Sequence, residues 1–347
     1  MSNNHSPPDA ESDYRQVRLA EWANSLTETV SHDQDRASLE TVSDDASFRR
    51  YFRLRTDAAV IVLMDAPPDK EPIAPFLDIG NRLLESGSRS PKIFGADQAL
   101  GFVAMEDFGN RQFAEAIRAS NKDRDDAFDR AARALERFQR VDTKALPIYS
   151  RKLLIDETSL YPEWFLTQYL GLSLSADFWD EWSRLNDSLL DSAIEQPQMF
   201  VHRDFHSRNL MMLDDGELGI LDFQDGVIGP VTYDWVSLLR DCYFQYEADF
   251  VDLQLDRLID QFERASGDTF NHGRWRQWFD WMGVQRHLKC AGIFARLAIR
   301  DNKPSYLRDI PRVLDHLIHV SSQYSSLEPL TRRLGSEVKP AMEKVNA

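Results

Sequence analysis

The segment VHRDFHSRNLM, residues 201–211, contains His202, Asp204 and Asn209 at the spacing H-x-D-x-x-x-x-N. A second carboxylate, Asp222, follows in ILDFQD. Phosphoryl transfer from ATP needs two oxygen ligands that hold Mg²⁺ against the phosphates, and a carboxylate that orients the attacking hydroxyl. We therefore expect Asp204 to act as the catalytic base. Asn209 and Asp222 would bind Mg²⁺, and His202 would support the loop.

Two other interpretations of this segment compete with phosphoryl transfer. His202 and His206 are four residues apart, as in some zinc sites, but a helix is needed to bring both imidazoles to one face. The segment instead has the pattern of a strand followed by a turn. The acidic residues could also do no more than cap a hairpin. Phosphoryl transfer accounts for more of the motif than either alternative.

The surrounding sequence predicts the elements that would position these groups. A helix is predicted from about Tyr14 to Glu28, then five strand-like segments, and long amphipathic helices follow after Gly109. The helical part is interrupted by one predicted hairpin, in which MFVH and NLMML are followed by LGILDF, so that Asp222 returns close to Asn209. The strand-like segments are residues 38–42, 49–54, 59–64, 91–96 and 101–108.

This organisation is typical of the α+β class, and in particular of the two-lobe protein-kinase-like fold. Such a fold has a small N-terminal lobe with an antiparallel β-sheet and a larger, mostly helical C-terminal lobe. We expect residues 1–13 to form a flexible tail, 14–107 the N-terminal lobe and 108–347 the C-terminal lobe. The first lobe would cover the nucleotide, and the second would carry the catalytic loop and the acceptor site.

Composition limits the possible partners. The net charge of −16 argues against binding to nucleic acid or to an anionic membrane. No apolar stretch is long enough to span a bilayer, and no secretory signal is visible, so we expect a cytoplasmic protein. The two cysteines, Cys242 and Cys290, exclude a disulfide framework.

Three motifs carry a family resemblance: FVHRDFHSRNLM, GILDFQD and GPVTYDWVSLLRD. They resemble those of the aminoglycoside phosphotransferase and choline kinase superfamily, over the chain from about Thr41 to the C-terminus. The resemblance implies that Asp234 is a buried acid that supports the catalytic loop. It also implies ATP and Mg²⁺ as cofactors.

Further segments are similar to those of the bacterial anomeric kinases. They include SDDASFRRYFRL, YPEWFL and GIFARLAIRDNKPSYLRDIPR. This resemblance implies phosphorylation of the C1 hydroxyl of N-acetylmuramate and N-acetylglucosamine, giving sugar 1-phosphates during peptidoglycan recycling. Only residues 223–231 separate Asp222 from a predicted helix start at Thr232, and there is no A-P-E motif. We therefore expect a small-molecule amino-sugar substrate and no protein substrate.

The expected nucleotide site departs from the kinase pattern. Residues 43–49 occupy the place of the phosphate-covering loop but contain no glycine, so Ser43 or Ser47 would contribute hydroxyl groups. Met64 stands where kinases usually place a lysine for the phosphates. Arg50 on the preceding strand is a candidate to replace this lysine, although it could equally be a surface arginine.

Adenine would bind between the lobes, near Met105, Glu106, Asp107 and Phe108, with the backbone making the contacts. For the acceptor, we consider Glu157 and the basic segment 285–312, which has seven Lys and Arg against two Asp. Within it, Lys289 or Arg296 could pair with the lactyl carboxylate of a muramic sugar. A solvated helix face would explain these charges nearly as well.

Two alternatives to the amino-sugar kinase remain. One is a kinase for an aminoglycoside or an amine alcohol, which would require an acidic acceptor site. The other is a nucleotide-binding pseudokinase module, suggested by Met64 in place of lysine. The presence of all four motif residues in residues 201–222 argues against the second alternative.

Overall fold

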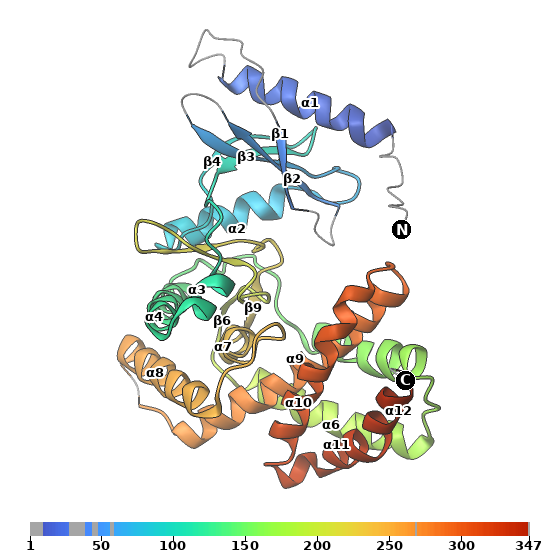
Figure 1. The fold of residues 1–347 in the computed structure, drawn as a ribbon. Helices are drawn as coiled ribbons and strands as arrows, with labels where there is room; N and C mark the ends of the chain where they lie inside the picture. Colours follow the sequence, from blue (N-terminus) through green and yellow to red (C-terminus); the bar gives the residue numbers. More distant parts are fainter. Residues whose placement is uncertain (1–9, 28–38, 44–47, 56–58, 268, 346–347) are drawn as a thin grey trace.

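The chain forms a β-rich lobe and a larger helical lobe, which confirms the predicted fold class (Figure 1). The computed structural model describes residues 10–27, 39–43, 48–55, 59–267 and 269–345, without the side chains of residues 10–13 and 43. Among these residues, no helix is both long and apolar enough to cross a membrane.

The small lobe is built on a five-stranded antiparallel sheet with the strand order β1-β2-β3-β5-β4. All five predicted strands are confirmed, each to within two residues at either end. The elements of this lobe are α1 (Ala10–Thr27), β1 (Leu39–Ser43), β2 (Arg50–Arg55), β3 (Val60–Asp65), α2 (Ala74–Glu85), β4 (Ile93–Asp97) and β5 (Phe102–Glu106).

The two faces of this sheet are covered by different helices. Phe52 and Leu54 of β2 share a small core with Leu19 of α1. Met64 of β3 belongs instead to the main core, together with Phe76 of α2. Successive side chains of a strand point to opposite faces of the sheet. Alternate residues of one strand therefore contact different helices. The face that carries Met64 is turned towards the large lobe.

The first helix begins earlier than the sequence predicts. α1 starts at Ala10, so the predicted tail of residues 1–13 includes its first turn. Residues 1–9 lie outside the described residues. The predicted division between residues 107 and 108 falls in the segment that joins β5 to α3.

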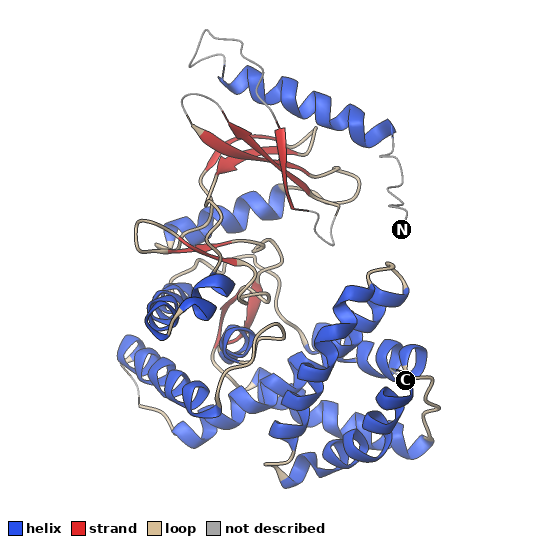
Figure 2. Cartoon of the chain, viewed as in Figure 1, coloured by secondary structure: helices blue, strands red, loops and turns tan. Residues whose placement is uncertain are grey.

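The large lobe is mostly helical, with four short strands near the small lobe (Figure 2). Its helices are α3 (Phe113–Ala119), α4 (Asn121–Phe138), α5 (Arg151–Thr158), the π-helix η1 (Tyr161–Tyr169), α6 (Ala176–Ile194), α7 (Thr232–Leu239), α8 (Ala248–Ser266), α9 (His272–Ile299), η2 (Pro304–Asp309), α10 (Ile310–Ser321), η3 (Ser325–Leu327), α11 (Glu328–Arg333), η4 (Leu334–Val338) and α12 (Lys339–Val345). The predicted N-cap of α6 is confirmed, because the Ser175 hydroxyl accepts a hydrogen bond from the Phe178 amide.

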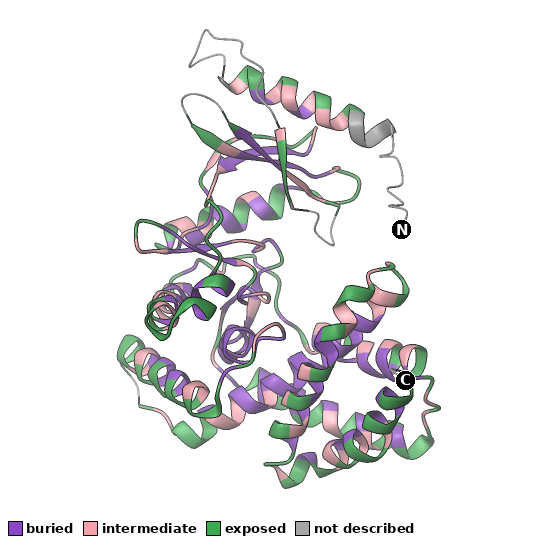
Figure 3. Cartoon of the chain, in the orientation of Figure 1, coloured by how far each residue is buried: buried purple, intermediate pink, exposed green. Residues whose placement is uncertain are grey.

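Helix α9 runs through the centre of the large lobe and is buried along most of its length (Figure 3). Trp275 near its start is 1% exposed and packs in the core. Gly292 allows α9 to approach the chain before η1 closely, because a Cβ at this position would lie 2.3 Å from the carbonyl carbon of Leu160.

The four short strands bring together the two segments that carry the phosphotransfer motif. The strands are β6 (Gln198–Val201), β7 (Leu210–Met212), β8 (Leu218–Ile220) and β9 (Val227–Pro230). The predicted hairpin is confirmed for β7 and β8, whereas β6 pairs with β9, a strand that the sequence did not indicate. The loop from β6 to β7 and the loop from β8 to β9 are therefore fixed at both ends by paired strands.

Candidate active site

A cleft with a volume of about 650 Å³ lies between the lobes. Its walls come from β2 and β3, the segment after β5, the loop before β7, and α9. It contains the three polar residues that the sequence singled out for acid–base and metal chemistry: Asp204, Asn209 and Asp222.

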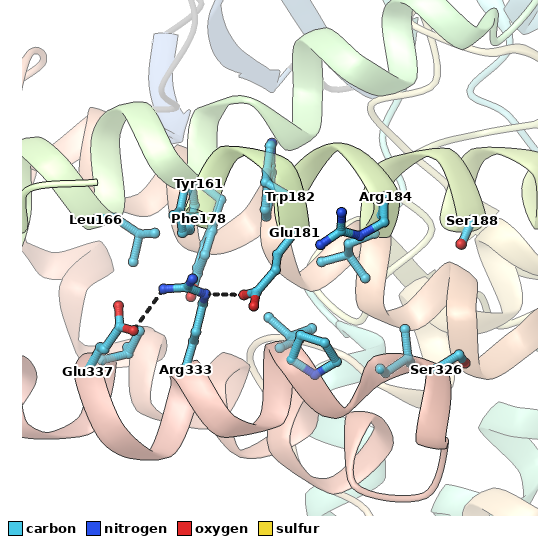
Figure 4. A pocket seen from close by; sticks show the side chains of 15 residues that line it. Tyr161, Leu166, Phe178, Glu181, Trp182, Arg184, Ser188, Ser326, Arg333 and Glu337 are labelled. Atoms are coloured by element: carbon cyan, nitrogen blue, oxygen red, sulfur yellow. Dashed lines mark hydrogen bonds and ion pairs between the residues drawn. The ribbon is translucent and has the colours of Figure 1, made fainter. Parts of the chain in front are cut away.

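A second cavity of about 270 Å³ lies within the large lobe, between the segment of η1 and α6 and that of α11 and η4 (Figure 4). Apolar side chains such as Phe178 and Trp182 line it. Two arginines also line it, Arg184 and Arg333, and Arg333 is paired with Glu181 and Glu337. None of the phosphotransfer motif residues reaches this cavity, so the interlobe cleft is the candidate active site.

Asp234 fixes the start of the catalytic loop. Its carboxylate accepts hydrogen bonds from the backbone amides of His202, at 2.7 Å, and Arg203, at 3.1 Å. Burial raises the pKa of Asp234 to about 7, although these two hydrogen bonds oppose the shift. This geometry agrees with the supporting role implied for Asp234.

His202 connects the two loops of the site. Its Nδ1 accepts from the Asp204 amide at 3.2 Å, so Nε2 carries the proton and donates to the Leu221 carbonyl at 2.9 Å. Burial lowers the pKa of His202 to about 4, which keeps the ring neutral. Because both ring nitrogens make hydrogen bonds within the protein, the zinc interpretation does not fit His202.

Asn209 and Asp222 lie side by side as the sequence predicted. The Asn209 amide nitrogen donates to the Asp204 carbonyl at 3.1 Å and to the Asp222 carboxylate at 3.3 Å. Asp222 has φ +60°, a left-handed conformation that costs about 1–2 kcal/mol for a residue with a Cβ. The next residue, Phe223, stacks on Phe76 of α2 with ring centroids 4.8 Å apart. The strained backbone and the buried ring together fix the direction of the Asp222 carboxylate.

This donor set suits a magnesium ion. The amide oxygen of Asn209 and the carboxylate of Asp222 are hard oxygen ligands, the type that Mg²⁺ prefers. Because the Asn209 nitrogen is held by its two hydrogen bonds, the oxygen of the same amide is directed away from them.

Asp204 is the partly exposed carboxylate of the site, with 39% of its side chain accessible. The Arg286 guanidinium lies 3.7 Å from it, on α9. Partial burial would raise the pKa of Asp204, but the positive charges of Lys289 and Arg286 outweigh this effect and hold the pKa well below its usual range. Asp204 is therefore ionised at neutral pH and can accept a hydrogen bond from a hydroxyl group.

A buried network positions the cations beside Asp204. Glu157 on α5 accepts from Arg203 at 2.6 Å and from Lys289 at 2.9 Å. Lys289 also donates to the Tyr233 hydroxyl at 3.0 Å. Arg286 donates to the Arg203 carbonyl at 2.8 Å. Glu157 therefore acts through Lys289 and Arg203, and it is not among the residues that line the cleft.

On the nucleotide side, Arg50 does not line the cleft. Its guanidinium pairs with Asp65, which also binds Arg15 of α1, so Arg50 lies on the face of the sheet that α1 covers. Arg53, on the opposite face of β2, lines the cleft. It makes a two-pronged ion pair with Asp107, at 2.6 and 2.9 Å. The assignment of Arg50 as the replacement for lysine is not supported by this position.

The segment between the lobes lines the cleft as expected, through Met105, Glu106, Asp107 and Phe108. The carboxylate of Glu106 is held by Arg89 at 2.9 Å, and the Glu106 amide donates to the Lys92 carbonyl. Ser43 ends β1, and its side chain is not described. Ser47 lies outside the described residues.

The two basic candidates for the acceptor site differ in their position relative to the cleft. Lys289 lines the cleft, whereas Arg296 does not. Arg296 lies near Arg300, Asp301 and Glu163 instead.

The charged residues that the sequence did not indicate are Arg53, Arg203, Arg208 and Asp241, and Arg286 was included only as part of the basic segment 285–312. Asp241 accepts from the Ser207 amide at 2.9 Å and so fixes the middle of the catalytic loop. Arg203 and Arg208 are adjacent to motif residues, and this adjacency was the one sequence feature that could have indicated them.

A carboxylate, an amide and a second carboxylate converging in an interlobe cleft are the groups that phosphoryl transfer from a nucleotide requires. A model described as the phosphotransferase enzyme family matches residues 38–278. The chain belongs to this family.

Relatives with curated names are similar over nearly the whole chain. The N-acetylmuramate/N-acetylglucosamine kinase of Neisseria meningitidis serogroup B is 41% identical over 326 residues, which cover 91% of this chain and 94% of the relative. The kinase of the same name from Pseudomonas aeruginosa is 38% identical over 315 residues, covering 86% and 88%.

Solved structures share the fold at low sequence identity. The choline kinase LicA from Streptococcus pneumoniae has a TM-score of 0.58 and 13% identity, covering 88% of this chain and 100% of its own. The aminoglycoside phosphotransferase APH(2'')-Ib, bound to ADP, has a TM-score of 0.55 and 14% identity, covering 86% and 97%.

Proposed function

We propose that this protein transfers the γ-phosphoryl group of ATP to the anomeric C1 hydroxyl of N-acetylmuramate and N-acetylglucosamine. The observation that carries the proposal is the ionised Asp204 beside Asn209 and Asp222, in a cleft large enough for a nucleotide and a sugar. The names of relatives that are 38–41% identical support the choice of acceptor.

In the proposed reaction, Asp204 accepts a hydrogen bond from the C1 hydroxyl and directs its oxygen at the γ-phosphorus. The new bond joins this oxygen to phosphorus, the bond from phosphorus to the bridging oxygen of ADP breaks, and the hydroxyl proton passes to Asp204. Because its pKa is depressed, Asp204 is a weak base, so its main contribution is orientation. An anomeric hydroxyl is more acidic than an ordinary alcohol, which makes a weak base sufficient.

Asn209 and Asp222 would hold Mg²⁺, which neutralises phosphate charge when bound. The segment from Met105 to Phe108 would hold the adenine. The products would be ADP and a sugar 1-phosphate, which suits the recycling of peptidoglycan sugars in the cytoplasm.

A protein substrate does not fit this site. In protein kinases, a long activation segment after the metal-binding aspartate docks the peptide. Here the corresponding segment is taken up by β9, which pairs with β6, and α7 begins immediately afterwards at Thr232. A small-molecule acceptor is the remaining choice.

The proposal is tested by measuring ADP release with Mg²⁺ and a panel of acceptors: N-acetylmuramate, N-acetylglucosamine, glucose, choline and kanamycin. We expect turnover with the two N-acetylated sugars only, and its loss when EDTA removes Mg²⁺. Turnover with choline or kanamycin alone would overturn the acceptor, and nucleotide binding without turnover on any acceptor would favour a pseudokinase.

A further inference from the structure

Arg208 presents a positive charge to the cleft beside the catalytic loop. It stands between Ser207 and the metal-site residue Asn209, and it lines the same cleft as Asp204. Its side chain is 41% exposed. The cation is therefore accessible to a ligand in the cleft.

The guanidinium of Arg208 is held in place, but it shares its carboxylate partner with two other arginines. It lies over the Tyr243 ring, with 3.5 Å from its carbon to the ring centroid. The nearest carboxylate, Asp309, is 4.0 Å away and lies closer to Arg312, at 3.3 Å. Among the described residues, no hydrogen bond from the Arg208 side chain to another protein group is found. Its planar set of donors is thus oriented but not used within the protein.

The other cations of the cleft differ from Arg208 because each of them donates a hydrogen bond to another group of the protein. Lys289 is bound to Glu157 and Tyr233, and Arg286 to the Arg203 carbonyl. Arg53 is bound to Asp107. An anionic group on the acceptor would therefore find its best unused partner in Arg208.

Arg208 lies only four residues after Asp204 on the same loop. Four residues of extended chain span at most about 14 Å. The turns closed by His206 onto Asp204 and by Asn209 onto His206 make the separation between Asp204 and Arg208 shorter. Tyr306 and Phe294 line the same part of the cleft and offer an apolar surface for a sugar ring.

We propose that Arg208 binds the lactyl carboxylate of N-acetylmuramate and is the residue that sets the preference between the two amino sugars. This inference rests on the proposed function. N-Acetylglucosamine has no lactyl group, so the reaction on this sugar would not use the contact. Arg208 would make a charge-assisted, two-pronged hydrogen bond to the carboxylate at C3 while Asp204 orients the hydroxyl at C1.

The test compares kcat/KM for both sugars in the wild-type enzyme, Arg208→Gln and Arg208→Lys. For Arg208→Gln we expect kcat/KM for N-acetylmuramate to fall roughly 10- to 100-fold more than that for N-acetylglucosamine, the fold-change of a lost hydrogen bond between charged groups. Arg208→Lys should recover part of the loss. The matched control is Arg308→Gln, which removes a 72% exposed arginine beside the same Asp309 but outside the cleft.

A substrate-side measurement needs no variant. With the wild-type enzyme, the carboxamide of N-acetylmuramate should react as poorly as N-acetylmuramate does with Arg208→Gln, and the variant should lose nothing further on the amide. An equal loss on both sugars, an increase in KM for ATP, or an unchanged ratio of the two kcat/KM values would overturn the proposal. Absence of turnover on either sugar by the wild-type enzyme would instead refute the proposed function.

Discussion

The two sides of the cleft use their charged residues differently. On the side of the small lobe, Arg53 is bound to Asp107, Arg50 faces α1, and the usual lysine position holds the buried Met64. On the side of the large lobe, Arg203, Arg286 and Lys289 surround two carboxylates, Glu157 and Asp204. In the small lobe, Arg53 therefore joins the sheet to the interlobe segment. In the large lobe, Arg286 and Lys289 keep the Asp204 carboxylate ionised.

This difference has a consequence for how the enzyme would be inactivated. Substitutions in the buried network of Glu157, Lys289 and Arg203, on the acceptor side, should lower both turnover and stability, because these residues are coupled to one another. Changes on the nucleotide side should act mainly on the KM for ATP.

The largest effect is expected from Asp204→Asn. The amide cannot accept the hydroxyl proton, so kcat should fall by about 10²- to 10⁴-fold, the usual range for a lost acid–base group. Calorimetry with ADP should show unchanged nucleotide binding, because the ligands of the nucleotide remain. A kcat within tenfold of the wild type would show that another group orients the acceptor.

Glu157→Gln should be the most destabilising change in the buried network. It leaves Lys289 and Arg203 without their common counter-charge, which should lower the free energy of unfolding by about 3–5 kcal/mol at neutral pH in urea titrations. The exposed Glu343→Gln is the control and should change it by less than about 0.5 kcal/mol.

The effect of Glu157→Gln should also depend on pH. Burial would raise the pKa of Glu157, but Lys289 and Arg203 lower it below the usual value of 4.5. A carboxyl group with a lowered pKa stabilises the fold above its unfolded-state pKa, and this contribution is lost as the pH falls through the folded-state value. The difference between wild type and variant should therefore shrink as the pH falls below 4.5. A difference independent of pH would indicate that the ion pairs are not its cause.

Gly292→Ala should separate α9 from the chain before η1. The added Cβ would meet the Leu160 carbonyl carbon at 2.3 Å, so α9 must shift, at a cost of about 1–3 kcal/mol. Because α9 carries Lys289 and Arg286, kcat should fall together with the melting temperature. Gly335→Ala, where nothing lies within 4 Å of the new Cβ, should leave both unchanged. Equal melting temperatures for the two variants would contradict the close packing.

The smallest effect is expected on the nucleotide side. Arg53→Met removes the ion pair that holds Asp107, and the KM for ATP should rise by about 5- to 20-fold while kcat changes little. Arg50→Met should affect stability more than the KM for ATP, because Arg50 binds Asp65 beside α1. The reverse result, with Arg50 controlling the KM for ATP, would restore the original assignment of this residue.

The part of the site that follows from local sequence was predictable, and the part that depends on packing was not. The spacing of Asp204, Asn209 and the later Asp222 indicated the chemistry, and hydrophobic alternation indicated the five strands. The same alternation placed Arg50 with Phe52, but it could not say which face would meet α1. That choice is made by the tertiary contacts of a helix far away in the sequence.

The buried charge network was out of reach for a related reason. Glu157, Lys289 and Tyr233 are far apart in sequence. Glu157 and Lys289 were considered separately for the acceptor, and nothing in the sequence indicated that they bind each other. Only the crossing of α5, α7 and α9 brings them together. Strand β9 was missed because its four residues lie between the D-F segment and a strong helix start.

The most direct test of the central claim is to locate the new phosphate by NMR after reaction of N-acetylglucosamine with ATP and Mg²⁺. We expect the anomeric proton of the product to be split by coupling to phosphorus, and no such product to form with Asp204→Asn. A phosphate ester on any other carbon, or hydrolysis of ATP without a sugar ester, would contradict the proposed reaction at C1.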